Sequence, residues 1–302
     1  MRPVRSLLIY IALVFGGGAL LAPWLYLLAQ GAARHWAAWA ALAANPFYRF
    51  VLRSILGLAV LGLWPLLRDC RMLSRRELGL ANTGRPLRNL AAGLAIGLGS
   101  LAAVALLATL CGGRALNFSH TGPEFLRYLR DTALAAILVA ILEELIFRAA
   151  LFGVLRKSFP VAVALLLSSA IYASVHFLQK APAPARIGWL SGLEVLPEMF
   201  HTPPDGLALV PAFFTLLVAG AILALAYQRT GTLFLSIGLH AGWIFCLKSY
   251  RFLTRQSPGP ARAFWGGDKL IDGWLPLLIL AGLLFLLLYS RRPAPASNPP
   301  AR

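Results

Sequence analysis

Two adjacent carboxylates, Glu143 and Glu144, lie in an apolar segment and are followed four residues later by Arg148. The ten residues before them, 133–142, carry no charge. A charged side chain at bilayer depth costs roughly 2.5–3.5 kcal/mol on insertion scales. We therefore expect these three side chains to face a polar interior, to pair with one another, or to take part in a reaction.

The spacing predicts different roles for the two acids. Glu144 and Arg148 are four residues apart, so on a helix they share a face and can pair. Arginine keeps its charge in proteins, so this pair would hold Glu144 ionised. Glu143 is rotated by about 100° on the same helix and is free to face a cavity. The doublet therefore predicts one structural acid beside one working acid.

Two histidines in other apolar segments could share this site. His176 follows Tyr172 by four residues, which places the two rings on one helix face, and His240 lies between Gly238 and Gly242. These glycines leave space beside the imidazole for a substrate backbone or another helix.

One glutamate and two histidines form a plausible site for activating water. Glu143, His176 and His240 could be ligands of zinc or another divalent metal. They could equally act without a metal, as acid/base and oxyanion groups. The sequence leaves both mechanisms open, and it contains no HExxH motif.

Each residue also has a purely structural interpretation. A single buried histidine is more often a polar residue that hydrogen-bonds a neighbouring helix, and a Glu–Arg pair is often structural. It is the combination of the two histidines with an unpaired acid that favours chemistry. The remaining histidines, His35, His120 and His201, lie at segment edges or in a Pro-rich loop and receive no role.

Composition places the chain in a membrane. Of the 302 residues, 59% are hydrophobic and 13% are charged, against about 25% charged in an average soluble domain. The net charge of +17 comes mostly from basic residues in short connections, which fits anionic lipid headgroups and excludes nucleic acid as the expected partner. The three cysteines share no close spacing, so we expect neither disulfides nor a thiolate metal site.

The hydropathy pattern predicts an all-α, polytopic membrane bundle of about eight transmembrane helices. The predicted spans are Ser6–Ala29, Phe50–Leu67, Leu90–Leu110, Thr132–Leu155, Pro160–Leu178, Leu207–Tyr227, Leu233–Leu247 and Leu275–Tyr289. We divide the chain into N-terminal helices and a basic loop (1–129), a catalytic helical core (130–250), and a basic loop, last helix and disordered tail (251–302). The expected location is a bacterial cytoplasmic membrane.

The order of these motifs resembles one protein family over roughly residues 130–247. Glu143-Glu144-x-x-x-Arg148, then aromatic-x-x-x-His176, then Leu-His240 is similar to the CAAX-prenyl-protease and bacteriocin-processing (CPBP, ABI) family of intramembrane endopeptidases. Phe213-Phe214, Gly220 and Arg229-Thr-Gly231 also resemble that family's third region.

The resemblance implies hydrolysis of a peptide bond in a membrane protein or peptide substrate. Glu143 and His176 would hold and deprotonate a water, His240 would donate to the oxyanion, and Glu144 and Arg148 would order the site.

Two positions depart from the family pattern. Tyr172 stands where Phe is usual, and Ile244 stands four residues after His240, where the family has Asn or a small polar residue. An oxyanion donor is therefore missing, moved or replaced. The favoured interpretation is an active protease of a specialised kind. The alternatives are an inactive immunity or scaffold protein of the same fold and, less favoured, a proton-coupled transporter.

Overall fold

The structure is a computed structural model, and it describes residues 2–81, 84–117, 119–200, 206–257, 262–267 and 270–289. The described residues are mostly helical, with one short pair of strands, which confirms the predicted all-α class. The first half contains α1 (Arg2–Ala12), η1 (Leu13–Gly17), α2 (Gly18–Ala33), η2 (Ala37–Trp39), α3 (Ala40–Ala43), α4 (Phe47–Asp69), α5 (Pro86–Leu110) and β1 (Arg114–Leu116).

The second half begins with the long helical segment that carries the acids. Its elements are α6 (Gly122–Glu144), η3 (Leu145–Phe152), α7 (Gly153–Arg156), α8 (Val161–Val175), α9 (Ser191–Glu198), α10 (Gly206–Thr230), α11 (Phe234–Leu253), β2 (Thr254–Gln256), α12 (Arg262–Trp265) and α13 (Trp274–Tyr289). Strands β1 and β2 form one short antiparallel pair at the end of the bundle. The predicted disordered tail, 293–302, lies outside the described residues.

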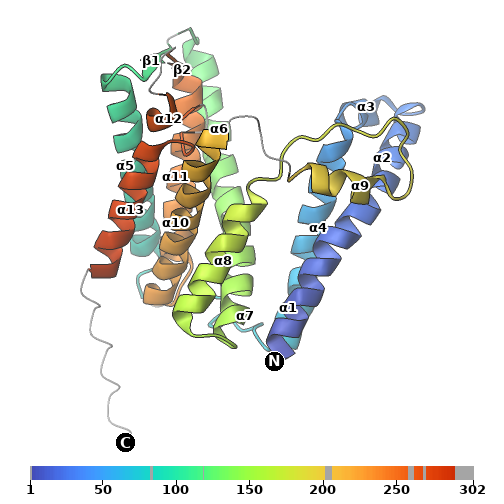
Figure 1. The fold of residues 1–302 in the computed structure, drawn as a ribbon, viewed down its shortest axis with the longest axis horizontal. Coiled ribbons are helices and arrows are strands. Elements are labelled where there is room, and N and C mark those ends of the chain that lie inside the picture. The colour runs from blue at the N-terminus through green and yellow to red at the C-terminus, as the bar shows by residue number, and fades with distance from the viewer. Residues whose placement is uncertain are drawn as a thin grey trace, which may run out of the picture.

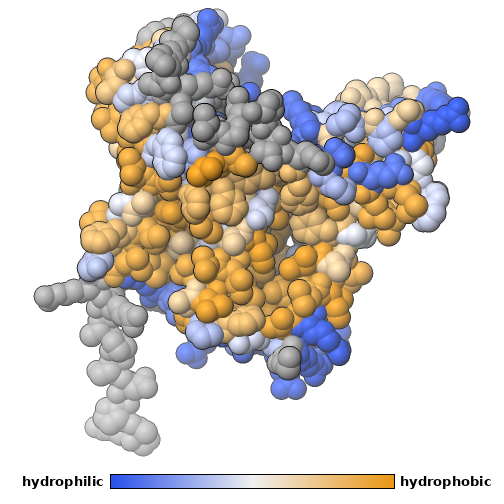
Figure 2. Space-filling view, in the orientation of Figure 1, coloured by the Kyte–Doolittle hydropathy of each residue, from blue (hydrophilic) through white to orange (hydrophobic). Residues whose placement is uncertain are grey.

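Several helices are suited to a bilayer by length and composition. Four described segments are long and apolar enough to cross a membrane, namely Arg2–Ala33, Phe47–Asp69, Pro86–Leu110 and Leu209–Thr230; Val161–Val175 and Trp274–Tyr289 are shorter apolar helices. The other two predicted spans, 132–155 and 233–247, are not among these helices, and they carry Glu143, Glu144, Arg148 and His240. Figure 2 shows a hydrophobic band across the middle of the molecule with hydrophilic side chains gathered above and below it. The protein is therefore a multi-pass membrane protein, and the number of eight spans stays a prediction.

The helices form two groups in Figure 1. Helices α1, α2, α3 and α4 make an N-terminal arm, and α9, although it lies between α8 and α10 in the sequence, packs on α2 of this arm. The remaining long helices form the main bundle. The arm meets the bundle where α4 contacts η3 and where α1 contacts α7. The division at residues 130 and 250 stays a prediction, because contacts such as those of α5 with α11 cross it.

Glycines bring α5 and α11 into close contact. Gly93 and Gly97 of α5 face the backbone of α11, and a Cβ at either position would overlap a carbonyl oxygen of that helix. Gly238 and Gly242 of α11 face α5 in the same way. Small residues at such spacing let helix backbones approach closely in membranes. The space predicted beside His240 is therefore filled by another helix, and this fixes the position of α11.

The segment with the acids is one continuous helical rod from α6 through η3 to α7. It begins with a capping box, in which the Thr121 backbone N–H donates to the Glu124 carboxylate over 2.9 Å. Residues 122–131 form the first turns of this rod. Directly after Glu144 the rod adopts π-helical geometry over η3, a feature that is frequent at functional sites.

Candidate active site

Glu144 and Arg148 form the buried base of the site, as the i, i+4 spacing predicts. The Arg148 Nη1 atom lies 3.3 Å from Glu144 Oε1, and both side chains are almost fully shielded. The Arg148 Nη2 atom also donates to the carbonyl oxygen of Gly220 on α10, at 3.5 Å. The guanidinium carbon lies 4.5 Å from the centre of the Tyr172 ring, within range of a cation–π contact. The pair thus ties the α6–η3 rod to α8 and α10.

Glu143, next along the helix, occupies a different environment. Its side chain is 22% exposed where that of Glu144 is 0% exposed. Its Oε2 atom lies 3.7 Å from His176 Nε2 and 3.7 Å from His240 Nε2. Among the described residues Oε2 has no hydrogen-bond partner, although it is shielded from solvent. The two acids thus differ in their partners, because Glu144 pairs with Arg148 and His240 whereas Glu143 faces the two Nε2 atoms. The division into a structural and a working acid stays a prediction.

His176 is positioned by the end of α8, whose C-cap it forms. Its Nδ1 atom lies 2.7 Å from the carbonyl oxygen of Tyr172. A carbonyl can only accept, so Nδ1 carries the proton and donates it. In the neutral ring the Nε2 atom is then a bare acceptor, and it is this atom that faces Glu143.

His240 is buried in the middle of α11, where the glycine contacts with α5 fix the backbone. Its Nδ1 atom lies 2.9 Å from Glu144 Oε1. Because Arg148 holds Glu144 as a carboxylate, Nδ1–H is the donor in this bond. The neutral ring therefore also presents an unprotonated Nε2 toward Glu143, and the Tyr172 hydroxyl lies 3.5 Å from this same atom.

Three acceptor atoms consequently converge: Glu143 Oε2 and the Nε2 atoms of His176 and His240. The separations of 3.7 Å from Oε2 are too long for direct hydrogen bonds. A buried carboxylate oxygen without a partner is costly unless a donor reaches it. A small molecule with two O–H groups satisfies this arrangement, and the site is suited to hold a water between the acid and an imidazole.

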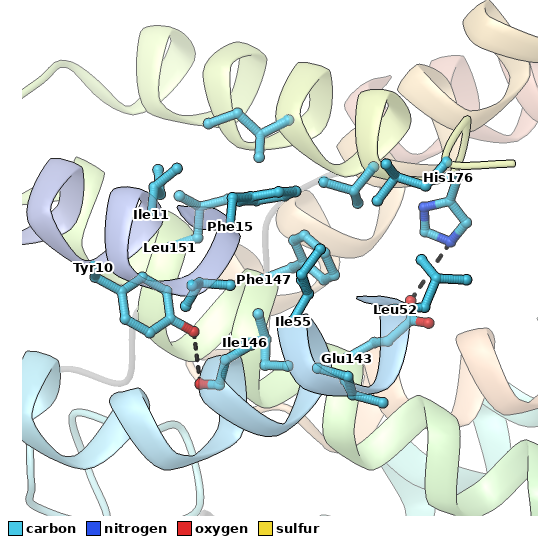
Figure 3. Close-up of a pocket in the computed structure, with 16 residues that line it drawn as sticks. Tyr10, Ile11, Phe15, Leu52, Ile55, Glu143, Ile146, Phe147, Leu151 and His176 are labelled. Carbon is cyan, nitrogen blue, oxygen red and sulfur yellow. Dashed lines mark hydrogen bonds and ion pairs between the residues drawn. The ribbon is translucent and has the colours of Figure 1, made fainter. Parts of the chain in front are cut away.

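An apolar cavity of about 350 Å³ reaches this cluster from the side of the arm. Glu143 and His176 lie at one end of it in Figure 3. Tyr10 lies at the other end, where its hydroxyl donates to the carbonyl oxygen of Ala59. Between them, α1, η1 and α4 contribute one wall, and η3 and α8 the other. An extended apolar group could lie in this cavity with its polar end at Glu143.

A bound metal is the alternative that the sequence left open for these three side chains. Zinc in proteins binds nitrogen and oxygen ligands at about 2.0–2.2 Å. Within the part of the chain that the structure describes, no group of three or more His, Cys, Asp or Glu side chains comes together in a way that could hold a metal ion. The metal-ligand role of Glu143, His176 and His240 stays a prediction.

The sequence predicted which polar side chains meet, and the structure brings all five together: Glu143, Glu144, Arg148, His176 and His240. Their roles in a reaction stay predictions. The sequence missed the Gly220 carbonyl that accepts from Arg148, and it missed the arm's contribution to the cavity. The arm's cavity residues have no distinguishing pattern, because apolar side chains that line a cavity look like those that face lipid.

Comparison with known proteins gives a family match to the segment that contains the cluster. Residues 126–246 match the sequence model of a family described as Rce1-like, type II CAAX prenyl endopeptidase Rce1-like. This match confirms the family resemblance, and it spans all five residues of the cluster. Neither the curated proteins nor the solved structures give a match to the chain.

Proposed function

We propose that this protein hydrolyses a peptide bond of a membrane-associated substrate by a glutamate-activated water. The match of residues 126–246 to the Rce1-like family of CAAX prenyl endopeptidases supports this proposal. The observation that carries the proposal is the convergence of Glu143 Oε2 with two imidazole Nε2 atoms at the end of an apolar cavity. The bacterial cytoplasmic membrane stays the predicted location.

In the proposed reaction, Glu143 and His176 hold the water by accepting its two protons as hydrogen bonds. Glu143 takes one proton as the water oxygen bonds to the peptide carbonyl carbon. When the carbon–nitrogen bond breaks, Glu143 returns that proton to the leaving nitrogen. The products are a new carboxyl terminus and a released amine, and the acid ends in its starting state.

Glu144 and Arg148 act by holding the other groups in place. Their pairing keeps Glu144 ionised, so that it fixes His240 in the Nδ1–H tautomer and sets the angle of its ring. Arg148 also fixes the Tyr172 ring on α8, whose carbonyl orients His176. The buried pair is thus expected to control the geometry of the site without touching the substrate.

The substrate class proposed here is a protein or peptide with an apolar chain near its carboxyl terminus. The cavity fits such a chain because its walls are apolar and its polar end is at Glu143. Ligand pockets of about 300–1,000 Å³ bury most of a drug-sized ligand, and this cavity lies in that range. A farnesylated peptide with a CAAX ending is the natural probe.

The test uses the purified protein in proteoliposomes with an internally quenched farnesylated CAAX peptide. The wild-type protein should cleave the peptide, whereas Glu143→Ala and His240→Ala should insert normally and lose cleavage. Glu194→Ala removes an exposed acid on α9 and serves as the matched control that keeps activity. Cleavage that persists in both site variants would refute the assignment.

A chelator separates the two mechanisms that the sequence left open. If Glu143 and His176 activate the water without a metal, as proposed, activity should survive dialysis against EDTA. Loss of activity that returns on addition of Zn²⁺ would replace the glutamate mechanism with a metallo-endopeptidase mechanism and leave the peptidase assignment in place.

A further inference from the structure

The position four residues after His240 offers no hydrogen-bond donor. It holds Ile244, which packs against the apolar cluster that includes Ile237 and Ala241. A tetrahedral intermediate carries a negative oxygen, and removing one donor to such an oxygen typically costs about 10²–10³ in rate. The donor must therefore come from another residue of the site.

His240 cannot supply this donor while its ring is neutral. The ring then has one N–H, at Nδ1, and that group is bonded to Glu144 at 2.9 Å. The Nε2 atom that faces the cluster carries a lone pair instead. A second residue with an O–H or N–H directed to the same point is needed.

Tyr172 has such a group. Its hydroxyl lies 3.5 Å from His240 Nε2, and the side chain is 4% exposed. The ring is held on several sides: the Arg148 guanidinium lies over its face, the Phe147 ring meets it edge-on at 5.1 Å, and the His176 ring lies 4.3 Å away. A tyrosine fixed in this way can direct its hydroxyl to one point without losing further side-chain freedom.

We propose that the Tyr172 hydroxyl is the oxyanion donor of this site, taking the place that Ile244 leaves empty. This inference rests on the proposed peptidase function. In the resting protein the O–H bonds to His240 Nε2, and in the intermediate it rotates to the negative oxygen of the substrate. The proton stays on the tyrosine throughout, so the hydroxyl contributes a hydrogen bond and no proton transfer.

The first test compares Tyr172→Phe with wild type in the proteoliposome assay. The change removes one oxygen atom and leaves the ring contacts with Arg148 and Phe147 in place. We expect kcat to fall about 100-fold with little change in KM, because the lost bond forms only in the transition state. Tyr227→Phe is the matched control, since Tyr227 is a buried tyrosine that donates to the Glu77 carbonyl away from the site, and it should keep kcat.

A rescue variant separates the donor role from a structural one. In the background of Tyr172→Phe, the further change Ile244→Asn places an amide one turn after His240. If the hydroxyl is a donor, kcat of the double variant should be at least tenfold higher than kcat of Tyr172→Phe alone. A full loss that Ile244→Asn does not relieve would assign Tyr172 to packing and overturn the proposal.

The resting contact can be measured without turnover. In protein labelled with ¹⁵N-histidine, the Nε2 resonance of His240 should move downfield in Tyr172→Phe, because a lone pair loses its donor. His120, which is distant along the chain, should not move. An unchanged His240 resonance together with an unchanged kcat would refute the role of Tyr172. A wild-type protein that cleaves nothing, but whose His240 resonance responds, would instead remove the peptidase assignment.

Discussion

The segment 126–246 and the N-terminal arm line the same cavity with different kinds of side chain. The family-matched segment supplies every charged side chain of the cluster and buries them in pairs and triads. The arm, which lies outside the match, supplies an apolar wall with a single polar hydroxyl, that of Tyr10, already bonded to its own helix pair. In the proposed function, catalysis and substrate recognition would therefore come from different parts of the chain.

The two regions therefore differ in how strongly their amino-acid sequence is constrained. The charged cluster works only with particular atoms at particular separations, so its sequence is recognisable from a family pattern. The arm wall requires only apolar side chains of suitable size, so many sequences can build it. We expect changes in the cluster to affect kcat or folding, and changes in the arm to affect KM and substrate choice.

The largest effect is expected for Glu143→Gln, which keeps the size of the side chain and removes its basicity. General-base catalysis contributes about 10²–10⁴ in rate, so kcat should fall by that factor. The melting temperature should change little, because the Glu143 Oε2 atom has no bond to lose within the described residues. Cleavage within a few-fold of wild type would break the assignment of chemistry to this residue.

Glu144→Gln tests the other acid of the doublet by stability. Its carboxylate is bonded to both Arg148 and His240 in a fully buried position. Removing one partner of a buried ion pair costs about 3–5 kcal/mol, since the remaining charge is left unpaired. Thermal unfolding in detergent should show a much lower melting temperature for Glu144→Gln, whereas that of Glu143→Gln should stay close to the wild-type value. Equal melting temperatures for the Glu144→Gln and Glu143→Gln variants would contradict the assignment of a structural role to Glu144 alone.

Phe15→Ala tests the arm. Phe15 lies in η1 and lines the cavity in Figure 3, and its removal widens the space for an apolar chain. Losing apolar contacts of this size is worth about 1–3 kcal/mol, so KM for the farnesylated peptide should rise about tenfold or more while kcat changes less. Leu13→Ala, a neighbouring position that is exposed on the outer surface, is the control and should behave as wild type. A fall in kcat alone would place the arm in the chemistry.

The smallest effect concerns the first turn of α6, away from the cavity. The backbone N–H of Thr121 donates to the Glu124 carboxylate, and this bond lowers the pKa of Glu124 below its ordinary value. A lowered folded-state pKa stabilises the protein above the unfolded pKa, and the contribution is lost as pH falls through the folded value. Wild type should therefore lose slightly more thermal stability than Glu124→Gln between pH of about 5 and about 3. If the melting temperatures of wild type and Glu124→Gln fall in parallel as the pH is lowered, the stabilising bond between Thr121 and Glu124 would be contradicted.

The sequence predicted which side chains form the cluster better than it predicted what surrounds them. The spacing of Glu144 and Arg148 on one helix face specifies their contact, because helix geometry is local. The contact of Glu143 with His240 joins residues almost a hundred positions apart, so the sequence could indicate it only indirectly, from polar residues in separate apolar segments and from the family pattern. The glycines around His240 indicated close approach, but not whether a substrate or α5 would fill the space.

The sequence could not predict which residues of the arm line the cavity, and the reason is physical. In a membrane, apolar residues are favourable both against lipid and against a cavity, so hydropathy does not separate Phe15 from exposed neighbours such as Leu13. The packing of α9 on α2 likewise depends on a close contact of Gly192 with Ala19, which a lone glycine in a Pro-rich loop does not reveal.

The central claim is that a water held by Glu143 and His176 attacks the peptide bond directly. A single-turnover reaction in H₂¹⁸O, followed by mass spectrometry of both the peptide product and the protein, tests this step. The account predicts one ¹⁸O atom in the new carboxyl terminus of the product and none in the protein fragment that contains Glu143. Label in that fragment would show that the glutamate itself had bonded to the substrate, and it would contradict the account.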